Sequence, residues 1–332
     1  MTLATGESEE VICKPDLDGS SEATFMIRSD HFAFETIDQG VHVALSRPDG
    51  GALANAGIVD LKNDVLVFDT SLNPRAAADL VSAASSRVGR PPSLAANSHW
   101  HLDHTLGNQL FSASSIFGTR ETRRILLAKR EQLMAELRPD VLRKEVRNLE
   151  MLVKNARSVA TRSYLNSVVR VNRFLLAVAP EIRLTPPNRT FVRRLKLPGS
   201  RSAELLSFGS GHTASDAILH LPDERIIFSG DLVVVGHHPN LTSGDPEHWL
   251  KVLAALEKLH AEKIVPGHGP VASTDAVQAV SDYLSTILRL AERKGEPAIP
   301  FRFREWVDPS QFEVNLKFLR SRDAGSPAAE GP

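Results

Sequence analysis

The chain has a single cysteine, no long apolar run and no excess of charge of either sign. Cys13, the one cysteine among 332 residues, excludes an intramolecular disulfide and a cysteine-rich zinc module. No apolar stretch approaches the roughly 20 residues that cross a bilayer. The first residues are acidic and small, without the basic start and apolar core of a secretory signal. We therefore expect a cytoplasmic protein that does not associate with membranes.

Charge and composition are those of an ordinary globular protein. Lys and Arg total 39 against 40 Asp and Glu, so the net charge does not indicate nucleic acid or acidic lipid as a partner. Hydrophobic residues make up 42% and charged residues 24%, close to the globular average. The polar N-terminus (residues 1–23) and the small-residue tail (residues 321–332) are expected to be flexible around a folded domain at residues 24–320.

The pattern of apolar residues predicts an α/β fold. Short apolar runs broken by turn signals fill about residues 34–98 and predict strands, with one helix from Pro74 to about Val88. Strand patterns resume at residues 190–197 (TFVRRLKL) and continue to about residue 230. Strands joined by helices in this way favour a layered arrangement of sheets and helices.

A helical segment, residues 119–185, interrupts the strands. Leu142, Val146, Leu149 and Val153 follow one another at helical spacing. Residues 119–196 hold 19 Lys or Arg against 7 Asp or Glu. This part of the chain is therefore basic, although the net charge of the whole chain is close to zero. Two interpretations stay open: solvated arginine faces, or attraction of an anionic small-molecule substrate. The arginines are not interleaved with a series of aromatic residues on which bases could stack, so a nucleic-acid partner is not expected.

Three of the 12 histidines fall within six residues, in the motif HWHLDH. Residues two apart in an extended segment point the same way, so His99 and His101 can hold one ion. Asp103 and His104, in the turn that follows, can reach a second ion beside it. Imidazole and carboxylate ligands together suit zinc, with iron or manganese as substitutes.

Three later motifs place metal-ligand residue types beside glycine. His212 follows Gly211, Asp231 follows Gly230 at the end of an apolar strand, and His268 follows Gly267 at the end of another. Glycine lets the backbone bend so that such side chains can converge. Asp69 closes the apolar run DVLVFDT ahead of all of them.

These motifs, in this order, resemble those of the metallo-β-lactamase superfamily over about residues 35–270. The resemblance implies an αββα sandwich with a dinuclear metal site at one edge of the two sheets, and it makes the helical segment an insertion, either a cap or an arm for homodimerisation. It assigns His99, His101 and His212 to the first metal, Asp103, His104 and His268 to the second, and Asp231 to a bridge between them. Asp69 would orient the loop that carries the histidines.

The ligands also indicate a branch of the superfamily. Asp231 at the bridging position is similar to the glyoxalase II, lactonase and ribonuclease Z pattern, whereas cysteine or serine would indicate true β-lactamases. His101, in place of a glutamate, disfavours the oxygen-reducing di-iron proteins. The implied function is a dinuclear zinc hydrolase. A bridging hydroxide would attack a small ester, lactone, thioester or β-lactam-like substrate, and Asp103 or Asp231 would transfer the proton.

Other functions remain open at this point. A mononuclear iron persulfide dioxygenase shares the HxHxDH motif, a ribonuclease-like phosphodiesterase would fit the basic helices, and a binding module could retain the fold without activity. His237 and His238, which follow Asp231 by six and seven residues, are candidates for substrate contact. Ser98 and Ser229 are expected to be turn residues, because the metals would supply the nucleophile.

Overall fold

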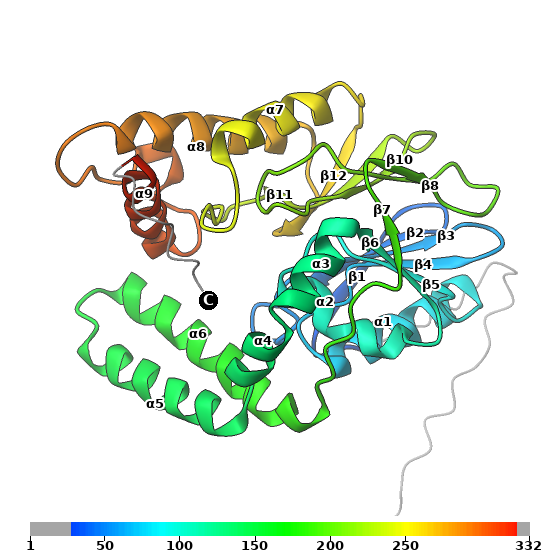
Figure 1. Cartoon of the computed structure of the whole chain (residues 1–332), viewed down its shortest axis with the longest axis horizontal. Helices are drawn as coiled ribbons and strands as arrows, with labels where there is room; N and C mark the ends of the chain where they lie inside the picture. Colours follow the sequence, from blue (N-terminus) through cyan, green and yellow to red (C-terminus); the bar gives the residue numbers. More distant parts are fainter. Residues whose placement is uncertain (1–27, 324–332) are drawn as a thin grey trace, which may run out of the picture.

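The computed structural model describes residues 28–323, which form two β-sheets packed face to face with helices on both outer sides (Figure 1). The first sheet has the order β1 (Phe32–Asp38), β2 (Val41–Ser46), β3 (Ala56–Asp60), β4 (Val65–Phe68), β5 (Leu94–Ala96), β6 (Ser115–Thr119) and β7 (Arg189–Phe191). The second has the order β12 (Lys263–His268), β11 (Ile226–Val234), β10 (Ile218–Leu221), β9 (Glu204–Leu206) and β8 (Arg194–Lys196).

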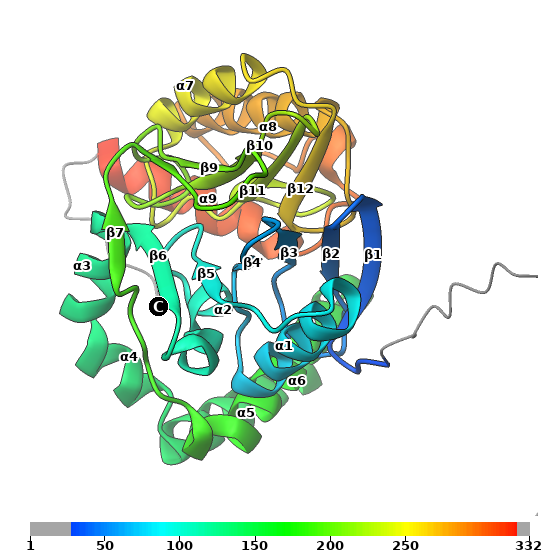
Figure 2. The ribbon, with the colours of Figure 1, turned by 90° about the vertical axis from the view of Figure 1, so that its right-hand side faces the viewer.

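The helices lie outside and beside these sheets. They are α1 (Pro74–Val88), α2 (Leu102–Thr105), α3 (Arg120–Ala128), α4 (Arg130–Glu136), α5 (Pro139–Asn155), α6 (Val159–Val178), α7 (Pro246–Glu257), α8 (Asp275–Ala291) and α9 (Pro309–Asp323), with short 3-10 helices η1 (Leu106–Phe111), η2 (Ala179–Glu181) and η3 (Phe301–Phe303). Figure 2 shows α1 below the first sheet and α7 and α8 above the second. The expected αββα sandwich is confirmed.

Helix α1 has the bounds that the sequence predicts, and its ends explain why. The Asn73 side chain accepts a hydrogen bond from the Ala76 N–H at 2.8 Å, and Pro74 occupies the first turn. Gly89 follows the last turn with φ of 76°, the left-handed conformation that favours glycine at a helix end. The helix buries Leu80 and several alanines against the first sheet. It joins β4 to its parallel neighbour β5, as crossover helices do.

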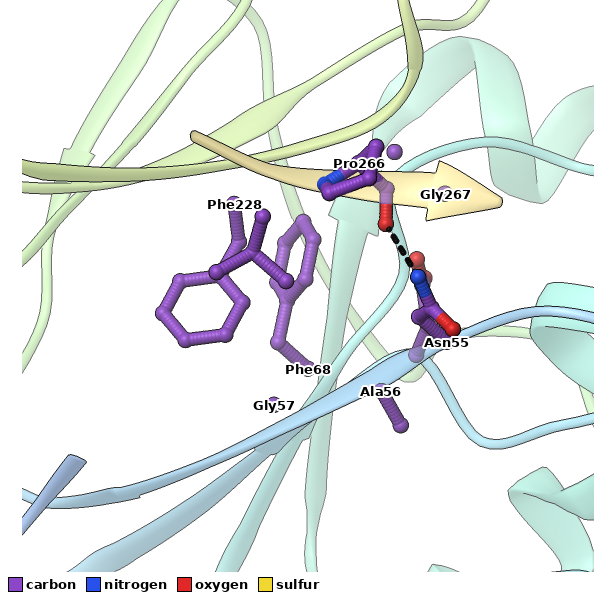
Figure 3. Close-up of a pocket in the computed structure, with 10 residues that line it drawn as sticks. Asn55, Ala56, Gly57, Phe68, Phe228, Pro266 and Gly267 are labelled. Atoms are coloured by element: carbon purple, nitrogen blue, oxygen red, sulfur yellow. Dashed lines mark hydrogen bonds between the residues drawn. The ribbon is translucent and has the colours of Figure 1, made fainter. Parts of the chain in front are cut away.

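The two sheets enclose an apolar core between them and are also tied together by hydrogen bonds of Asn55. Phe68 of β4 and Phe228 of β11 meet with ring centroids 6.1 Å apart, and Gly57 leaves room for the Phe228 ring. Figure 3 shows Asn55, just before β3, donating to the Pro266 carbonyl of β12 at 3.0 Å. A second donation, to Gly269 at 2.8 Å, continues this link. These bonds fix the first sheet against the strand that ends at His268.

Two expectations about strands need correction. Residues 190–197 are not one strand: β7 belongs to the first sheet and β8 to the second, and Val192 and Arg193 cross between them. Their pairing partners decide this, because β7 pairs with β6 and β8 with β9. Asp231 does not follow the end of its strand, because β11 continues to Val234 through irregular pairing with β12 after Gly230.

The helical segment contains α3 to α6 and η2. Helices α5 and α6 run side by side as a hairpin, with α9 on the other side of α6 (Figure 1). The loop between β2 and β3 also holds α6, because Arg170 pairs with Asp49 at 2.7 Å. Helix α6 is therefore fixed to the sandwich from one side, while its other side faces the segment before α9.

The chain ends are described only in part. The expected flexible N-terminus, residues 1–23, lies outside the described residues, as do residues 324–332 of the expected tail. Helix α9 extends to Asp323, so the first three tail residues are helical. Arg320 explains this extension, because it donates to the carbonyls of Ala291, Arg293 and Gly295. Over residues 28–323, no helix combines the length and apolar character needed to cross a membrane.

The first prediction concerns His42, which is buried on β2. His42 Nδ1 lies 2.9 Å from Thr36 Oγ1 in a hydrogen bond, and Arg87 donates to the same hydroxyl at 3.3 Å. Burial, and then Arg87, lower the pKa of His42 from 6.5 to about 4. Unfolding therefore takes up a proton as the pH falls from about 6.5 to about 4, and stability is lost in that window. Between about pH 7 and about pH 4.5, His42→Gln should lose less stability than the wild type loses, by on the order of 1 kcal/mol. Thermal melts of both proteins at the two pH values measure this difference. An unchanged pH dependence would contradict this assignment, and the exposed His260→Gln is the control.

Candidate metal centre and its cavity

The structure brings together all seven residues that the sequence suggests as ligands. They form two groups, and within each group one possible ligand atom per residue lies within 4.8 Å of the others. The first group is His99, His101, His212 and Asp231, and the second is Asp103, His104 and His268. They come from the loop after β5, from α2, from the loop between β9 and β10, and from β11 and β12 at one edge of the sandwich.

Hydrogen bonds on the outer ring nitrogens orient the imidazoles. His212 Nδ1 donates to the Asn240 carbonyl at 3.0 Å, and His268 Nδ1 donates to the Leu53 carbonyl at 3.1 Å. Since Nδ1 carries the proton in both rings, each Nε2 is free to bind a cation. His101 is turned the other way, with Nε2 3.2 Å from Ser243 Oγ and Nδ1 3.0 Å from His212 Nε2. Two ring nitrogens so close together are suited to sharing one ion.

A further observation supports metal binding by these ligand residues. Three buried atoms that face the site, His99 Nε2, His104 Nε2 and Asp231 Oδ1, make no hydrogen bond. The last two lie 3.2 Å apart without hydrogen-bond geometry. Leaving a buried polar atom unpaired costs about 1–3 kcal/mol, so His99 Nε2, beside the His104–Asp231 ion pair, indicates a partner that is not a protein group. A cation would satisfy all three.

The electrostatics of the two groups differ. Burial, and then His104, hold the pKa of His99 well below its ordinary value, and burial and His212 lower the pKa of His101 to about 3. These rings are neutral, which is the form that binds metals. Burial would raise the pKa of Asp231, but His268 and His104 outweigh it and hold that pKa well below its ordinary value. Burial would lower the pKa of His268, but Asp231 and Asp103 outweigh it and raise the pKa to about 10. The second group therefore already stabilises positive charge, and a bound cation would release these protons.

Asp69 lies directly behind the histidine loop. Its Oδ1 accepts the Ser98 N–H at 2.7 Å, and its Oδ2 accepts from His104 Nδ1 at 2.8 Å. The residue is 2% exposed and has φ of 61°, a conformation that costs a non-glycine residue about 1 kcal/mol or more. The surrounding bonds hold it in this conformation, and both carboxylate oxygens are then used to position the loop and one ring.

The second prediction follows from this geometry. In Asp69→Asn only one side-chain atom can accept, so the amide N–H₂ faces either Ser98 N–H or His104 Nδ1–H. If it faces the ring, the proton moves to His104 Nε2 and blocks the atom that points into the site. We expect the affinity for the second metal to fall by about 10- to 100-fold, while the first metal is retained. Titration of metal-free protein, with the exposed Asp275→Asn as control, measures this, and two ions bound with wild-type affinity would contradict it.

Glycine is required at two points beside Asp231. Gly230 has φ of 51°, and a Cβ there would lie 2.5 Å from Ser98 Cβ. A Cβ on Gly267 would lie 1.9 Å from Asp231 Oδ1. The first glycine permits the irregular turn of β11 that directs Asp231 into the site, and the second leaves space for its carboxylate.

Sequence reasoning missed two residues that position the ligands. Ser98, expected to be only a turn residue, places Oγ 2.9 Å from His99 Nδ1 and 3.4 Å from His104 Nδ1. Asp216 accepts from the Gly211 N–H at 2.9 Å and from the Thr213 N–H and hydroxyl, so it holds both sides of the loop that carries His212. Its position four residues after His212 is the only sequence signal.

A cavity of about 980 Å³ opens from the ligands to the surface. Ligands His101, Asp103, His212, Asp231 and His268 form its inner end. Ser163, Tyr164, Ser167, Val168 and Val171 of α6 form one wall, and Val307, Asp308, Pro309 and Gln311 at the start of α9 form another. The helical segment thus contributes directly to the space in front of the ligands.

His237 and His238 both line this cavity, in different surroundings. The His237 ring lies 5.9 Å from the His268 ring, and its Nδ1 donates to the Val235 carbonyl at 2.9 Å. His238 is 5% exposed and packs against Tyr283, whose hydroxyl lies 3.3 Å from its Nδ1. His237 is therefore the better placed of the two to reach a bound molecule.

The two cavity walls meet at Tyr164. Burial, followed by the nearby Asp308 charge, raises the pKa of the Tyr164 hydroxyl to about 12. Tyr164 therefore stays protonated at neutral pH. The segment carrying Asp308 is bound in turn to the site strand, because Val307 N–H donates to the Gly236 carbonyl at 2.7 Å.

Comparisons with known proteins agree with this architecture. Residues 49–268 match the family model described as the metallo-beta-lactamase superfamily. A relative from Caenorhabditis elegans, "Beta-lactamase-like protein 2 homolog", is 36% identical over 74 residues. That match covers 22% of this chain, and the chain spans about a quarter (24%) of the relative's length.

Solved structures share the fold at low identity. DIM-1 metallo-beta-lactamase exposed to ceftazidime is similar with a TM-score of 0.56 and 17% identity, over 77% of this chain and 97% of that one. The FIM-1 enzyme from Pseudomonas aeruginosa, in its mono-zinc form, gives 0.52 and 18%, over 77% and 96%. The metallo-beta-lactamase from Pontibacter korlensis gives 0.55 and 17%, over 76% and 99%.

Proposed function

The chain belongs to the metallo-beta-lactamase superfamily, and from this premise we propose that it is a hydrolase that binds two divalent metal ions, zinc foremost, and cleaves an ester, lactone, thioester or β-lactam-like bond. The observation that carries the proposal is the convergence of seven ligand residues in two adjacent groups, with three of their buried atoms unpartnered. The ions would supply an activated water and polarise the carbonyl under attack.

The protein's own groups provide the remaining functions. His99, His101 and His212 would hold the first ion, Asp103, His104 and His268 the second, and Asp231 would contact both, since its carboxylate lies 3.3 Å from His268 Nε2 and 3.5 Å from His212 Nε2. Asp103 is ionised near neutral pH: burial would raise its pKa, but His104 and His268 outweigh burial and lower it to about 2. Asp103 and Asp231 are therefore the carboxylates that can accept a proton from the attacking water and return it to the leaving group.

The proposal is tested by metal analysis together with a hydrolysis panel. The panel contains a thioester, a lactone, a phosphodiester and a β-lactam, assayed with zinc-loaded protein. About two zinc ions per chain and turnover of a carboxylic ester, thioester, lactone or amide support the proposal. One iron per chain with oxygen-dependent persulfide oxidation, or turnover of the phosphodiester alone, would replace it. Two bound ions without hydrolysis of any substrate would leave a binding protein.

A further inference from the structure

The side of helix α6 that lines the cavity carries no charged residue, and the arginines of the helix bind other parts of the chain. The five residues that face the cavity, Ser163, Tyr164, Ser167, Val168 and Val171, recur at helical spacing and carry no charge. The arginines of this helix are engaged elsewhere: Arg170 with Asp49 at 2.7 Å, Arg173 with Glu150 at 2.5 Å, and Arg162 with the Ala156 carbonyl at 2.9 Å. The basic character of the helical segment is thus directed away from the metal ligands.

The rest of the described lining is mostly apolar, and Asp308 is its one acidic residue outside the ligand groups. Leu53, Val234, Pro239, Pro270, Val307 and Pro309 add apolar surface, and Arg47 is the one Lys or Arg among the described lining residues. Val168 and Val171 remain partly exposed although they lie within the molecule. Apolar surface left open toward a cavity costs free energy until a partner covers it. A volume of about 980 Å³ also lies at the upper end of the range for small-molecule sites, far more than a short ester needs.

We propose that α6 is the specificity wall of this site and that the substrate is an acyl compound whose extended apolar chain lies along Val168 and Val171. The inference rests on the proposed hydrolase function, with the reacting carbonyl at the ligands and the chain directed toward α6. Each methylene buried in such a wall contributes about 0.8 kcal/mol, or about fourfold in binding, until the cavity is filled. The chain length of the substrate, rather than its charge, would then decide which compounds react.

The test is a series of p-nitrophenyl esters from acetate to decanoate with the zinc-loaded full chain. We expect kcat/KM to be on the order of 10²-fold higher for decanoate than for acetate. The double variant Val168→Thr/Val171→Thr keeps the side-chain shape and adds two hydroxyls. It should lose about tenfold on decanoate, mainly through KM, and stay within about twofold on acetate. Val159→Thr, on the same helix but 83% exposed, is the matched control and should change neither.

Binding of decan-1-ol, measured by calorimetry, provides a second readout that needs no turnover. The wild type should bind it, and the double valine variant should bind it about tenfold more weakly. Equal rates along the ester series, or equal losses on acetate and decanoate, would overturn the specificity wall and leave the hydrolase proposal intact. Decanol binding that depends on the two valines, without hydrolysis of any ester or of any thioester, lactone or β-lactam in the panel, would overturn the hydrolase proposal and retain the apolar site.

Discussion

Asp231→Asn is expected to lower hydrolysis by on the order of 10²- to 10³-fold with little change in fold. Asp231 is 8% exposed, and its two oxygens face both ligand groups: Oδ1 lies 3.2 Å from His104 Nε2 of the second group, and Oδ2 lies 3.5 Å from His212 Nε2 of the first. Asparagine keeps the shape but removes the negative charge that offsets two dications, and its N–H₂ cannot bind a metal. The second ion should weaken most, because the Asp231 carboxylate lies closer to His104 and His268, at 3.2 and 3.3 Å, than to His212, at 3.5 Å.

Metal analysis and steady-state rates measured across a zinc titration check this result. Excess zinc should restore part of the lost metal content, while the maximal rate stays low because the bridging charge is still missing. Asp275→Asn, at an exposed position on α8, is the control for the chemical change itself. Wild-type turnover with two ions bound would show that Asp231 does not bridge the two groups.

His99→Ala should reduce the metal content from about two ions to about one, and hydrolysis by on the order of 10³-fold. His99 is 1% exposed and its Nε2 is one of the buried atoms without a partner, so its only evident use is as a ligand. Its removal leaves the first ion with His101, His212 and the shared Asp231. Because one ion fewer is bound, zinc should also stabilise the variant less than it stabilises the wild type.

Thermal melts with and without a chelator separate this effect from simple misfolding. Without metal, the wild type and His99→Ala should melt within a few degrees of each other. Zinc should raise the melting temperature of the wild type more than it raises that of His99→Ala. His260→Asn, exposed and far along the chain at the end of α7, is the control. Full activity with one ion or fewer per chain would contradict a dinuclear centre.

The sequence alone was sufficient for features that depend on local spacing. The bounds of α1 follow from Asn73, Pro74 and Gly89, because caps act within one turn. The ligand residue types could be read from motifs a few residues long, and the αββα architecture followed from the resemblance of these motifs to those of the superfamily. The chemistry of a metal site is carried by its donor atoms, and HWHLDH supplies several of them in one stretch.

Only the tertiary structure decided features that depend on pairing between distant segments. Residues 190–197 divide between two sheets because different strands accept their backbones, and Asp231 reaches the site through the turn at Gly230. Ser98 positions two imidazoles, although its sequence context resembles an ordinary turn. Composition showed that the helical segment is basic, but the partners of Arg170 and Arg173 lie on other elements, and they determine that α6 presents valines rather than arginines to the cavity. The number of charged residues in a segment does not tell where their side chains point, because that direction is fixed only by packing in the folded chain.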